Sequence, residues 1–294
     1  MQPRLLKDSL AGRLMAVLTF GSLLLVVAMG VGLYLKSAPI LHEHSLWDLL
    51  TEANWKPMKN QFGFFPFLMG TLWVTALAVA IALPTSLLTS IFLTEYSHRR
   101  LSRMVYPLLD ILAGLPSVIY GVWGTLIIVP WVAGVVAPWV DRQSSGYTVL
   151  AGGIVLSVMI VPLLVSLFME LFNNVSRDLR EASLALGATR WQTTKQVVLR
   201  RAAPGMLAAL VLAISRTLGE TIAVLMVCGN LAIVPSSLLD ACYPIPALIA
   251  NNYGEMLSLP LYESALMFAA FILFFVVLVF NLTSRIVLRR LNTH

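Results

Sequence analysis

The sequence carries little charge. Asp, Glu, Lys and Arg make up only 12% of its 294 residues, whereas 59% are hydrophobic. Soluble globular domains carry about 25% charged residues, so this composition excludes an ordinary soluble domain. The longest polar stretch, residues 36–60, is too short to form a folded domain of its own. We therefore treat residues 1–294 as one domain.

Common catalytic motifs are also missing. The chain has no G-x-x-x-x-G-K-[ST] phosphate loop, no H-E-x-x-H, no C-x-x-C and no G-x-S-x-G. It therefore lacks the usual route to nucleotide hydrolysis and the common signatures of membrane hydrolases and metal sites. We predict that the chain is not an enzyme and holds no metal or cofactor of its own. Any uphill transport must take its energy from another subunit.

Cysteine is scarce. The two cysteines, Cys228 and Cys242, are too few for a disulfide framework. We expect Cys228 to be a small buried apolar residue. A bridge to Cys242 would require Leu231–Ala241 to fold back, and we expect none.

Long hydrophobic runs, in contrast, dominate the chain. A bilayer core of about 30 Å requires about 20 residues of apolar helix, and six segments approach or exceed that length. They predict an all-α polytopic membrane protein with six transmembrane helices. The first run exceeds the roughly 7–15 apolar residues of a signal peptide, so we expect it to be retained. The six segments are Leu14–Leu35, Gln61–Thr94, Ile111–Val140, Ser144–Met169, the Arg216-containing stretch Leu210–Leu225, and Ser264–Ser284.

Basic residues are distributed unevenly between the loops. Fifteen of the 20 Lys and Arg residues fall on one side of the six spans, and four on the other. Because basic residues concentrate in cytoplasmic loops, both termini are predicted to be cytoplasmic, with residues 36–60 and 231–262 outside. This topology accounts for the net charge of +6, and we predict no nucleic-acid partner. The fifteen are Arg4, Lys7, Arg13, Arg99, Arg100, Arg103, Arg177, Arg180, Arg190, Lys195, Arg200, Arg201, Arg285, Arg289 and Arg290.

One span contains two charged residues. Within Leu210–Leu225, Arg216 and Glu220 interrupt apolar sequence. Arg216 follows Pro204 by about 18 Å of helix, which places it near the membrane midplane. An arginine there costs roughly 2.5–3.5 kcal/mol, and Glu220, on the same helical face, can neutralise it. Two interpretations stay open: a structural ion pair that links helices, or an arginine that meets an anion in a water-accessible pathway while Glu220 holds it ready.

The third span is rich in glycine and proline. Gly114, Pro116, Gly121, Gly124 and Pro130 make a regular helix improbable. Broken helices near the midplane can present backbone donors to a substrate, whereas small residues also allow close helix packing. The sequence favours neither.

Residues 177–200, which we call the docking loop, are polar and cytoplasmic. Their pattern is helical on both sides of Gly187, with an apolar face formed by Leu184 and Leu186–Ala188. A structured helix–glycine–helix in a cytosolic loop predicts docking to a partner, as an amphipathic helix enters a groove. The alternative is a helix that lies on the lipid surface.

The docking loop resembles the EAA loop of ATP-binding-cassette (ABC) importer permeases, which reads E-A-A-x3-G-x9-I-x-L-P. The matching positions are Glu181, Ala182, Gly187, Val197 and Leu199, while Ser183 replaces the second alanine and Arg200 the proline. The resemblance implies the type I importer permease fold. It also implies that Glu181, Ala182, Gly187 and Leu199 dock onto an ATP-binding subunit.

Two other stretches are similar to the phosphate permeases of these importers. Ala113–Gly124 reads A-G-L-P-S-V-I-Y-G-V-W-G and Ser215–Ala223 reads S-R-T-L-G-E-T-I-A, while Phe92–Tyr96 also fits. The resemblance implies import of inorganic phosphate by alternating access across the bacterial inner membrane. In that family the residues that match Arg216 and Glu220 are implicated in transport.

The resemblance also implies partners. These are a second, PstA-like permease, two identical PstB-like ATP-binding subunits that hold ATP and Mg²⁺, and a periplasmic PstS-like phosphate-binding protein. A guanidinium fork suits phosphate oxygens better than an ammonium group does. We therefore hypothesise that Arg216 binds the anion, with the Ser215, Thr217 and Thr221 hydroxyls as neutral donors.

Three alternatives come from other classes. The same machinery could import molybdate, tungstate or sulfate. An ATP-independent channel or secondary transporter could use Arg216 and Glu220 as a proton relay, although the docking loop argues against it. A membrane enzyme such as a lipid phosphatase would need a nucleophile and a base at one depth, and the sequence has no such cluster.

Overall fold

The computed structural model describes residues 3–254 and 260–292. Within these residues, six helices are long and apolar enough to cross a membrane, which confirms the predicted all-α membrane architecture. The long single helices are α1 (Pro3–Glu43), α3 (Phe65–Ile91), α8 (Val149–Asn173), α11 (Leu199–Leu218) and α14 (Pro260–Asn292), and the remaining span is Ser117–Trp139.

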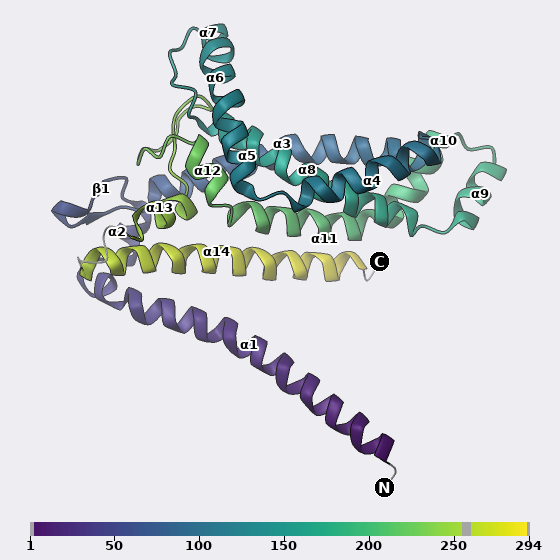
Figure 1. Ribbon diagram of the computed structural model, residues 1–294, viewed down its shortest axis with the longest axis horizontal. Helices are drawn as coiled ribbons and strands as arrows, with labels where there is room; N and C mark the ends of the chain where they lie inside the picture. Colours follow the sequence, from purple (N-terminus) through teal and green to yellow (C-terminus); the bar gives the residue numbers. More distant parts are fainter. Residues whose placement is uncertain (1–2, 255–259, 293–294) are drawn as a thin grey trace.

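Four helices run side by side and form the bundle: α3, α8, α11 and α14 (Figure 1). The closest packing joins α3 to α8, because two glycines of α8 let the helices approach. An ideal Cβ on Gly152 would lie 3.2 Å from Val74, and one on Gly153 would lie 2.5 Å from Leu77. Small residues allow such close approach between membrane helices.

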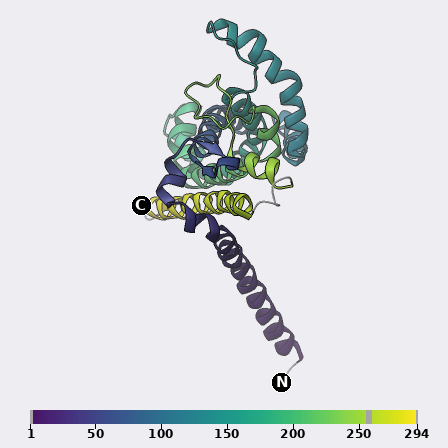
Figure 2. The ribbon, with the colours of Figure 1, turned by 90° about the vertical axis from the view of Figure 1, so that its left-hand side faces the viewer.

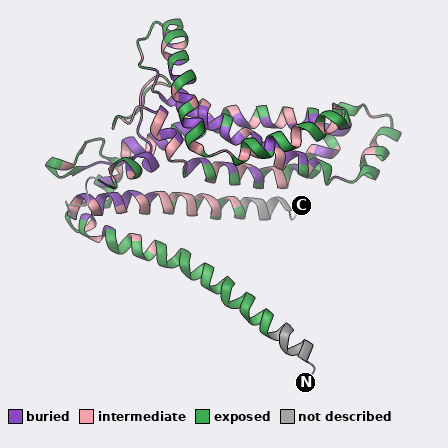
Figure 3. Ribbon diagram, in the orientation of Figure 1, coloured by how far each residue is buried: buried purple, intermediate pink, exposed green. Residues whose placement is uncertain are grey.

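Two arms leave the bundle on opposite sides (Figure 2). The first is α1, whose C-terminal part packs on α14. The ring centroids of Tyr34 and Phe271 lie 5.9 Å apart, and Lys36 forms a 3.4 Å ion pair with Glu263. The second arm is the Ser117–Trp139 span. The described apolar side chains at the start of α1 are exposed (Figure 3). Such apolar arms need lipid or protein around them.

The end of the bundle at which α1 finishes carries an aromatic cluster. Here α2 (Leu46–Thr51) precedes an antiparallel pair of short strands, β1 (Trp55–Lys56) and β2 (Gln61–Phe62), joined by a 3₁₀ turn over Pro57–Lys59. The Trp55 ring lies 4.9–6.0 Å from the rings of Phe62, Phe64, Phe67 and Tyr262. The first eight residues of the predicted 36–60 loop are helical, since α1 continues to Glu43. Ser37 and Ile40 in this part of α1 are buried.

The third span differs from the single segment that the sequence suggested. A separate amphipathic helix, α4 (Arg99–Gly114), comes first, and the chain breaks at Leu115–Pro116 because proline disfavours the helical conformation in the residue before it. The span then continues through α5 (Ser117–Trp123), η3 (Gly124–Ile128), α6 (Val129–Trp131), η4 (Val132–Val136) and α7 (Ala137–Trp139). Each π-helical turn, η3 and η4, ends two residues before a proline, where the wider turn relieves the proline's clash with the preceding turn.

The segment that we predicted to be external folds back over the bundle at Leu231–Ala241, which is the fold-back that a bridge between Cys228 and Cys242 would require. The Cys242 amide donates to the Cys228 carbonyl at 2.9 Å, so the two cysteines are adjacent, although both thiols are free. The segment also caps α8, because the Val149 and Leu150 amides donate to carbonyls of Asp240 and Leu238. These amides begin a helix and have no partner within it. Hydropathy cannot predict that this segment folds back, because the fold-back depends on the free amides at the start of α8.

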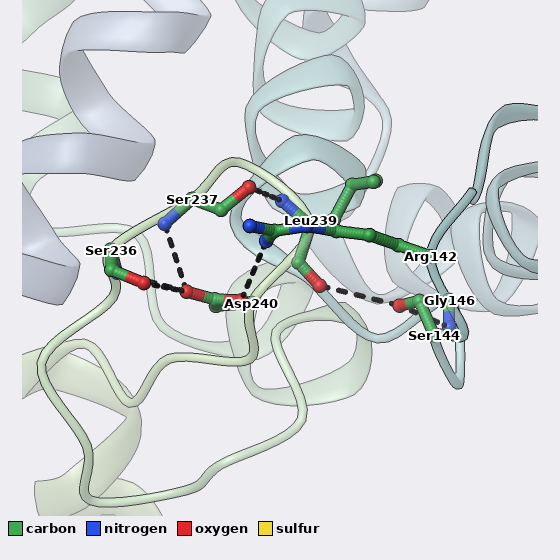
Figure 4. Close-up of polar contacts among 7 residues, drawn as sticks. All are labelled: Arg142, Ser144, Gly146, Ser236, Ser237, Leu239 and Asp240. Carbon is green, nitrogen blue, oxygen red and sulfur yellow. Dashed lines mark hydrogen bonds and ion pairs between the residues drawn. The ribbon is translucent and has the colours of Figure 1, made fainter. Parts of the chain in front are cut away.

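Asp240 fastens the same segment to the loop before α8 (Figure 4). Its Oδ2 accepts hydrogen bonds from the Ser236 hydroxyl and from the Ser236 and Ser237 amides at 2.8–2.9 Å, and its Oδ1 lies 3.7 Å from the Arg142 guanidinium. The Ser144 hydroxyl adds a bond to the Leu239 carbonyl. The segment is therefore a fixed part of the fold.

Candidate functional site

The span that contains Arg216 is not one continuous helix. The prediction of one helix across Leu210–Leu225 is wrong. Helix α11 ends at Leu218, and a short helix, α12 (Ile222–Val227), begins after a three-residue interruption. The Gly219 amide donates to the Arg216 carbonyl at 3.3 Å, which tightens the last turn. Glycine in a helix interior costs about 1 kcal/mol relative to alanine. The break therefore lies where helix formation is weakest.

The interruption separates Arg216 from Glu220. Three ion pairs form among the described residues, and none includes either side chain. The proposed neutralisation of Arg216 by Glu220 is thus wrong for this conformation, because the two no longer share a helical face. Glu220 instead accepts a 3.4 Å hydrogen bond from the Ala223 amide at the start of α12, where a helix favours a negative charge. Arg216 is exposed and unpaired within the described chain.

The three hydroxyl residues around Arg216 bond to protein groups. Ser215 bonds to the Val211 carbonyl at 2.9 Å and lies 3.2 Å from Asn281 of α14. Thr217 is buried and donates to the Ala213 carbonyl, and Thr221 donates to the Gly219 carbonyl. Each must exchange its present bond to donate to an anion. Asn281 was not predicted as a site residue, although it is the one amide side chain in the predicted span Ser264–Ser284.

Arg216 lies where two interrupted segments meet. It is close enough to Tyr120 of α5 for an electrostatic interaction, and the Tyr120 hydroxyl donates to the Leu112 carbonyl across the α4–α5 break at 2.7 Å. Helix α5 and the following η3 pack on α12, and the Thr125 hydroxyl of η3 donates to the Met226 carbonyl at 3.2 Å. Paired helix breaks of this kind line substrate pathways in transporters.

Close packing explains two of the glycines in the third span. An ideal Cβ on Gly121 would lie 2.7 Å from Met226 Sδ, and one on Gly124 would lie 2.5 Å from Val155. Gly121 and Gly124 therefore serve close packing, and the chain breaks at Leu115–Pro116. That this break presents backbone donors to a substrate stays a prediction.

The docking loop has the predicted helix–glycine–helix form. Helix α9 (Arg177–Ala185) ends before Gly187, whose φ of +84° suits glycine. Helix α10 (Arg190–Thr193) then begins with a capping box between Thr189 and Gln192. The loop projects from the end of the bundle opposite the aromatic cluster (Figure 1). Its second helix continues through η5 (Thr194–Val198) into α11, so the span is longer than expected.

The docking-loop residues expected to meet a partner lie largely at the surface. Glu181, Ala182 and Gly187 are exposed, and Leu199 is half-buried as the first residue of α11. Leu186 is 90% exposed, which leaves a large apolar side chain without packing in this chain. A 3.0 Å hydrogen bond between the Ser183 and Thr193 hydroxyls joins the two arms of the loop.

A largely buried ion pair at the base of the docking loop was not predicted from the sequence. Arg180 of α9 lies 3.0 Å from Glu95 of η2 (Phe92–Tyr96), the π-helical end of α3, and also donates to the Phe172 carbonyl at the end of α8. Their side chains are only 20% and 12% exposed. Glu95 could have indicated this pair, because it is the first charged residue after the apolar run Gln61–Thr94.

Comparison with known families gives an extended match. The model described as "Binding-protein-dependent transport system inner membrane component" matches residues 86–293. The chain is 35% identical over 245 residues to the "Probable ABC transporter permease protein YqgH" of Bacillus subtilis, which covers 81% of this chain and 78% of the relative.

The names of two further relatives include the word phosphate. The "Phosphate transport system permease protein PstC" of Xylella fastidiosa (strain 9a5c) is 34% identical, over 82% of this chain and 78% of its own. The "Probable phosphate transport system permease protein PstC" of Methanocaldococcus jannaschii is 33% identical, over 90% and 88%.

Solved structures share the fold. A bacterial alginate ABC transporter bound to its periplasmic protein gives a TM-score of 0.63 at 15% identity, over 98% of both chains. The MetNI methionine ABC transporter gives 0.57 at 18% identity, over 81% of this chain and 99% of that chain. The helices are arranged as in the membrane subunits of these transporters.

Proposed function

This chain belongs to the family of binding-protein-dependent transport system inner membrane components, and we propose that it is the permease subunit of an ATP-driven importer of inorganic phosphate. One observation carries the substrate assignment: relatives named as phosphate permeases are 33–34% identical over 82–90% of the chain. Such a permease is a membrane subunit and is not itself catalytic.

The energy for transport would come from partners. We propose that two ATP-binding, PstB-like subunits receive the docking loops of this chain and of a second, PstA-like permease. The exposed Leu186 supports this docking, because an apolar helix face gains by entering a groove. ATP and Mg²⁺ would be bound by those subunits, and a PstS-like binding protein would deliver phosphate.

The orientation follows from charge. The docking loop and its many basic residues would face the cytoplasm of the cell, with both termini on that side and the aromatic cluster outside. The membrane would be the bacterial inner membrane.

Arg216 would be the anion contact in the pathway. It is exposed, lacks an ion pair among the described residues, and lies where the α4–α5 and α11–α12 breaks meet. A planar guanidinium can bind two phosphate oxygens at once. One arginine only partly compensates a phosphate dianion, so a second charge from the partner permease would complete the site. Glu220, held at the start of α12, would place a negative charge near Arg216 without forming an ion pair with it.

Alternating access would involve the base of the docking loop. Closure of the ATP-binding subunits would move α9, and the Arg180–Glu95 pair would carry that movement to α3. Since α3 packs along α8, the whole bundle would respond.

Uptake in proteoliposomes tests the substrate. The vesicles contain this chain, its second permease, the ATP-binding subunits and the binding protein, with ATP inside. We expect uptake of labelled phosphate that excess molybdate, tungstate and sulfate leave unchanged. Displacement of phosphate by one of these anions would keep the architecture and replace the substrate. Uptake without the ATP-binding subunits would reject an ATP-driven importer.

A further inference from the structure

A polar cavity opens at the docking-loop end of the bundle, away from Arg216. Its volume is about 510 Å³, and it lies between the inner end of α3, helix α4, the end of α8 and helix α9. Three arginines line it, one from α4 and two from α9: Arg103, Arg177 and Arg180. Ser97, Ser102 and Asn173 add neutral hydrogen-bonding groups.

The charge in this cavity is not balanced by the protein. Arg180 is paired with Glu95, but Arg103 and Arg177 form no ion pair among the described residues. The Nε of Arg180 is buried and has no hydrogen-bond acceptor in the described chain. Three guanidinium groups around one cavity repel one another, and a buried donor without an acceptor is unfavourable. Both features call for an anion with several acceptor oxygens.

We propose that this cavity binds a phosphate group, either of free orthophosphate or of an anionic lipid headgroup. Guanidinium groups bind phosphate oxygens with paired, charge-assisted hydrogen bonds, and the two serine hydroxyls and the asparagine amide can donate to the remaining oxygens. The proposal does not depend on the role of Arg216, because Arg216 belongs to α11 and no residue of α11 lines the cavity.

Occupancy would act on the docking loop. Arg177 and Arg180 both belong to α9, and Arg180 already bonds to α3 and α8 through Glu95 and Phe172. A phosphate group shared by Arg103 and α9 adds a link between α4 and the docking loop. It would therefore hold α9 against the bundle and restrain its movement with a partner subunit.

Binding is tested on the full chain in phosphatidylcholine nanodiscs. Labelled orthophosphate is titrated into the Arg216→Gln background, which removes the other candidate anion contact. The test variant adds Arg103→Gln and Arg177→Gln, and the control adds Arg100→Gln, an exposed α4 residue that does not line the cavity. Native mass spectrometry of the same proteins, taken from membranes with phosphatidylglycerol, counts retained anionic lipids.

In the control we expect either saturable binding of one orthophosphate or retention of one anionic lipid. In the test variant we expect the affinity for orthophosphate to fall at least tenfold in the first case, and the lipid to be lost in the second. Phenylglyoxal labelling of the chain without substitutions needs no variant: the bound source should protect Arg103 and Arg177, mapped by peptide mass spectrometry. Phosphate binding and lipid retention distinguish the two sources. If neither ligand depends on these arginines and neither protects them, for instance because a partner's acidic side chain fills the cavity, the proposal is overturned.

Discussion

Arg180 of the docking loop lies 3.0 Å from Glu95 at the end of α3, and both side chains are largely shielded from solvent. The pair is the ionic link between α9 and the bundle in the described chain. Breaking a buried pair by removal of one partner leaves the other charge uncompensated, which costs roughly 3–5 kcal/mol. The pair thus makes the position of the docking loop dependent on the position of α3.

Glu95→Gln should destabilise the protein and uncouple ATP hydrolysis from uptake. We expect a loss of about 3 kcal/mol, because Arg180 then keeps a buried charge without its anion. Thermal unfolding in detergent and the ratio of phosphate imported to ATP hydrolysed measure the two effects. The double variant with Arg180→Gln should recover part of the stability. Strictly additive losses would show that the two residues act separately.

Gly187→Ala should weaken coupling through the backbone. Gly187 has φ +84° with no atom within 4 Å of an ideal Cβ, so the cost is conformational strain, roughly 1–2 kcal/mol. Gly187→Asn should retain more activity, because asparagine tolerates this conformation better. Gly114→Ala, also with open space and in a helix, is the control. The measurement is ATPase stimulation by the loaded binding protein, and equal activity of the Ala and Asn variants would contradict the argument.

Gly152→Ala should overpack the α8 interface. An ideal Cβ there lies 2.5 Å from Cys228 Sγ, and overpacking costs about 1–3 kcal/mol. Cys228→Ala in the same chain removes the sulfur and should restore part of the melting temperature. If Gly152→Ala melts like the unaltered chain, or if Cys228→Ala gives no rescue, the close approach of Gly152 to Cys228 is incorrect.

The segment around Asp240, which we predicted to be external, should loosen in acid. Partial burial would by itself raise the pKa of Asp240, but hydrogen bonds from Ser236 and Ser237 and the Arg142 charge together lower that pKa below its ordinary value. A carboxyl with a lowered folded-state pKa stabilises the fold above its unfolded pKa of about 3.9, and this contribution disappears as pH falls through the folded pKa.

Hydrogen exchange of residues 229–243 between pH 6 and pH 2.5, corrected for intrinsic rates, measures this loosening. Exchange should rise at the acid end in the unaltered chain. Asp240→Asn should exchange faster at pH 6 and respond less to acid, since it has no proton to gain. An identical acid response in both proteins would assign the effect to another group.

Much of the architecture could be predicted from the sequence. The six spans follow from hydropathy, and the helix–glycine–helix of the docking loop follows from the pattern around Gly187, because both signals are local. The break at Gly219 could not be predicted, since one glycine costs too little to end a helix and tertiary packing decides. The hydrogen bonds between Leu238–Asp240 and the start of α8, like the Arg180–Glu95 pair, join residues far apart in sequence, which periodicity cannot detect. The roles of Arg216 and Glu220 remain predictions.

The most direct test of the account is phosphate uptake by Arg216→Gln and Arg216→Lys in reconstituted proteoliposomes, with assembly checked by co-purification. If Arg216 binds the anion, Gln should lower uptake at least tenfold, about 1.4 kcal/mol or more, while Lys, which keeps the charge but not the planar fork, should fall in between. ATP hydrolysis by the assembled complex should persist in both variants. Uptake at the unaltered rate in a properly assembled Arg216→Gln complex would contradict the central claim.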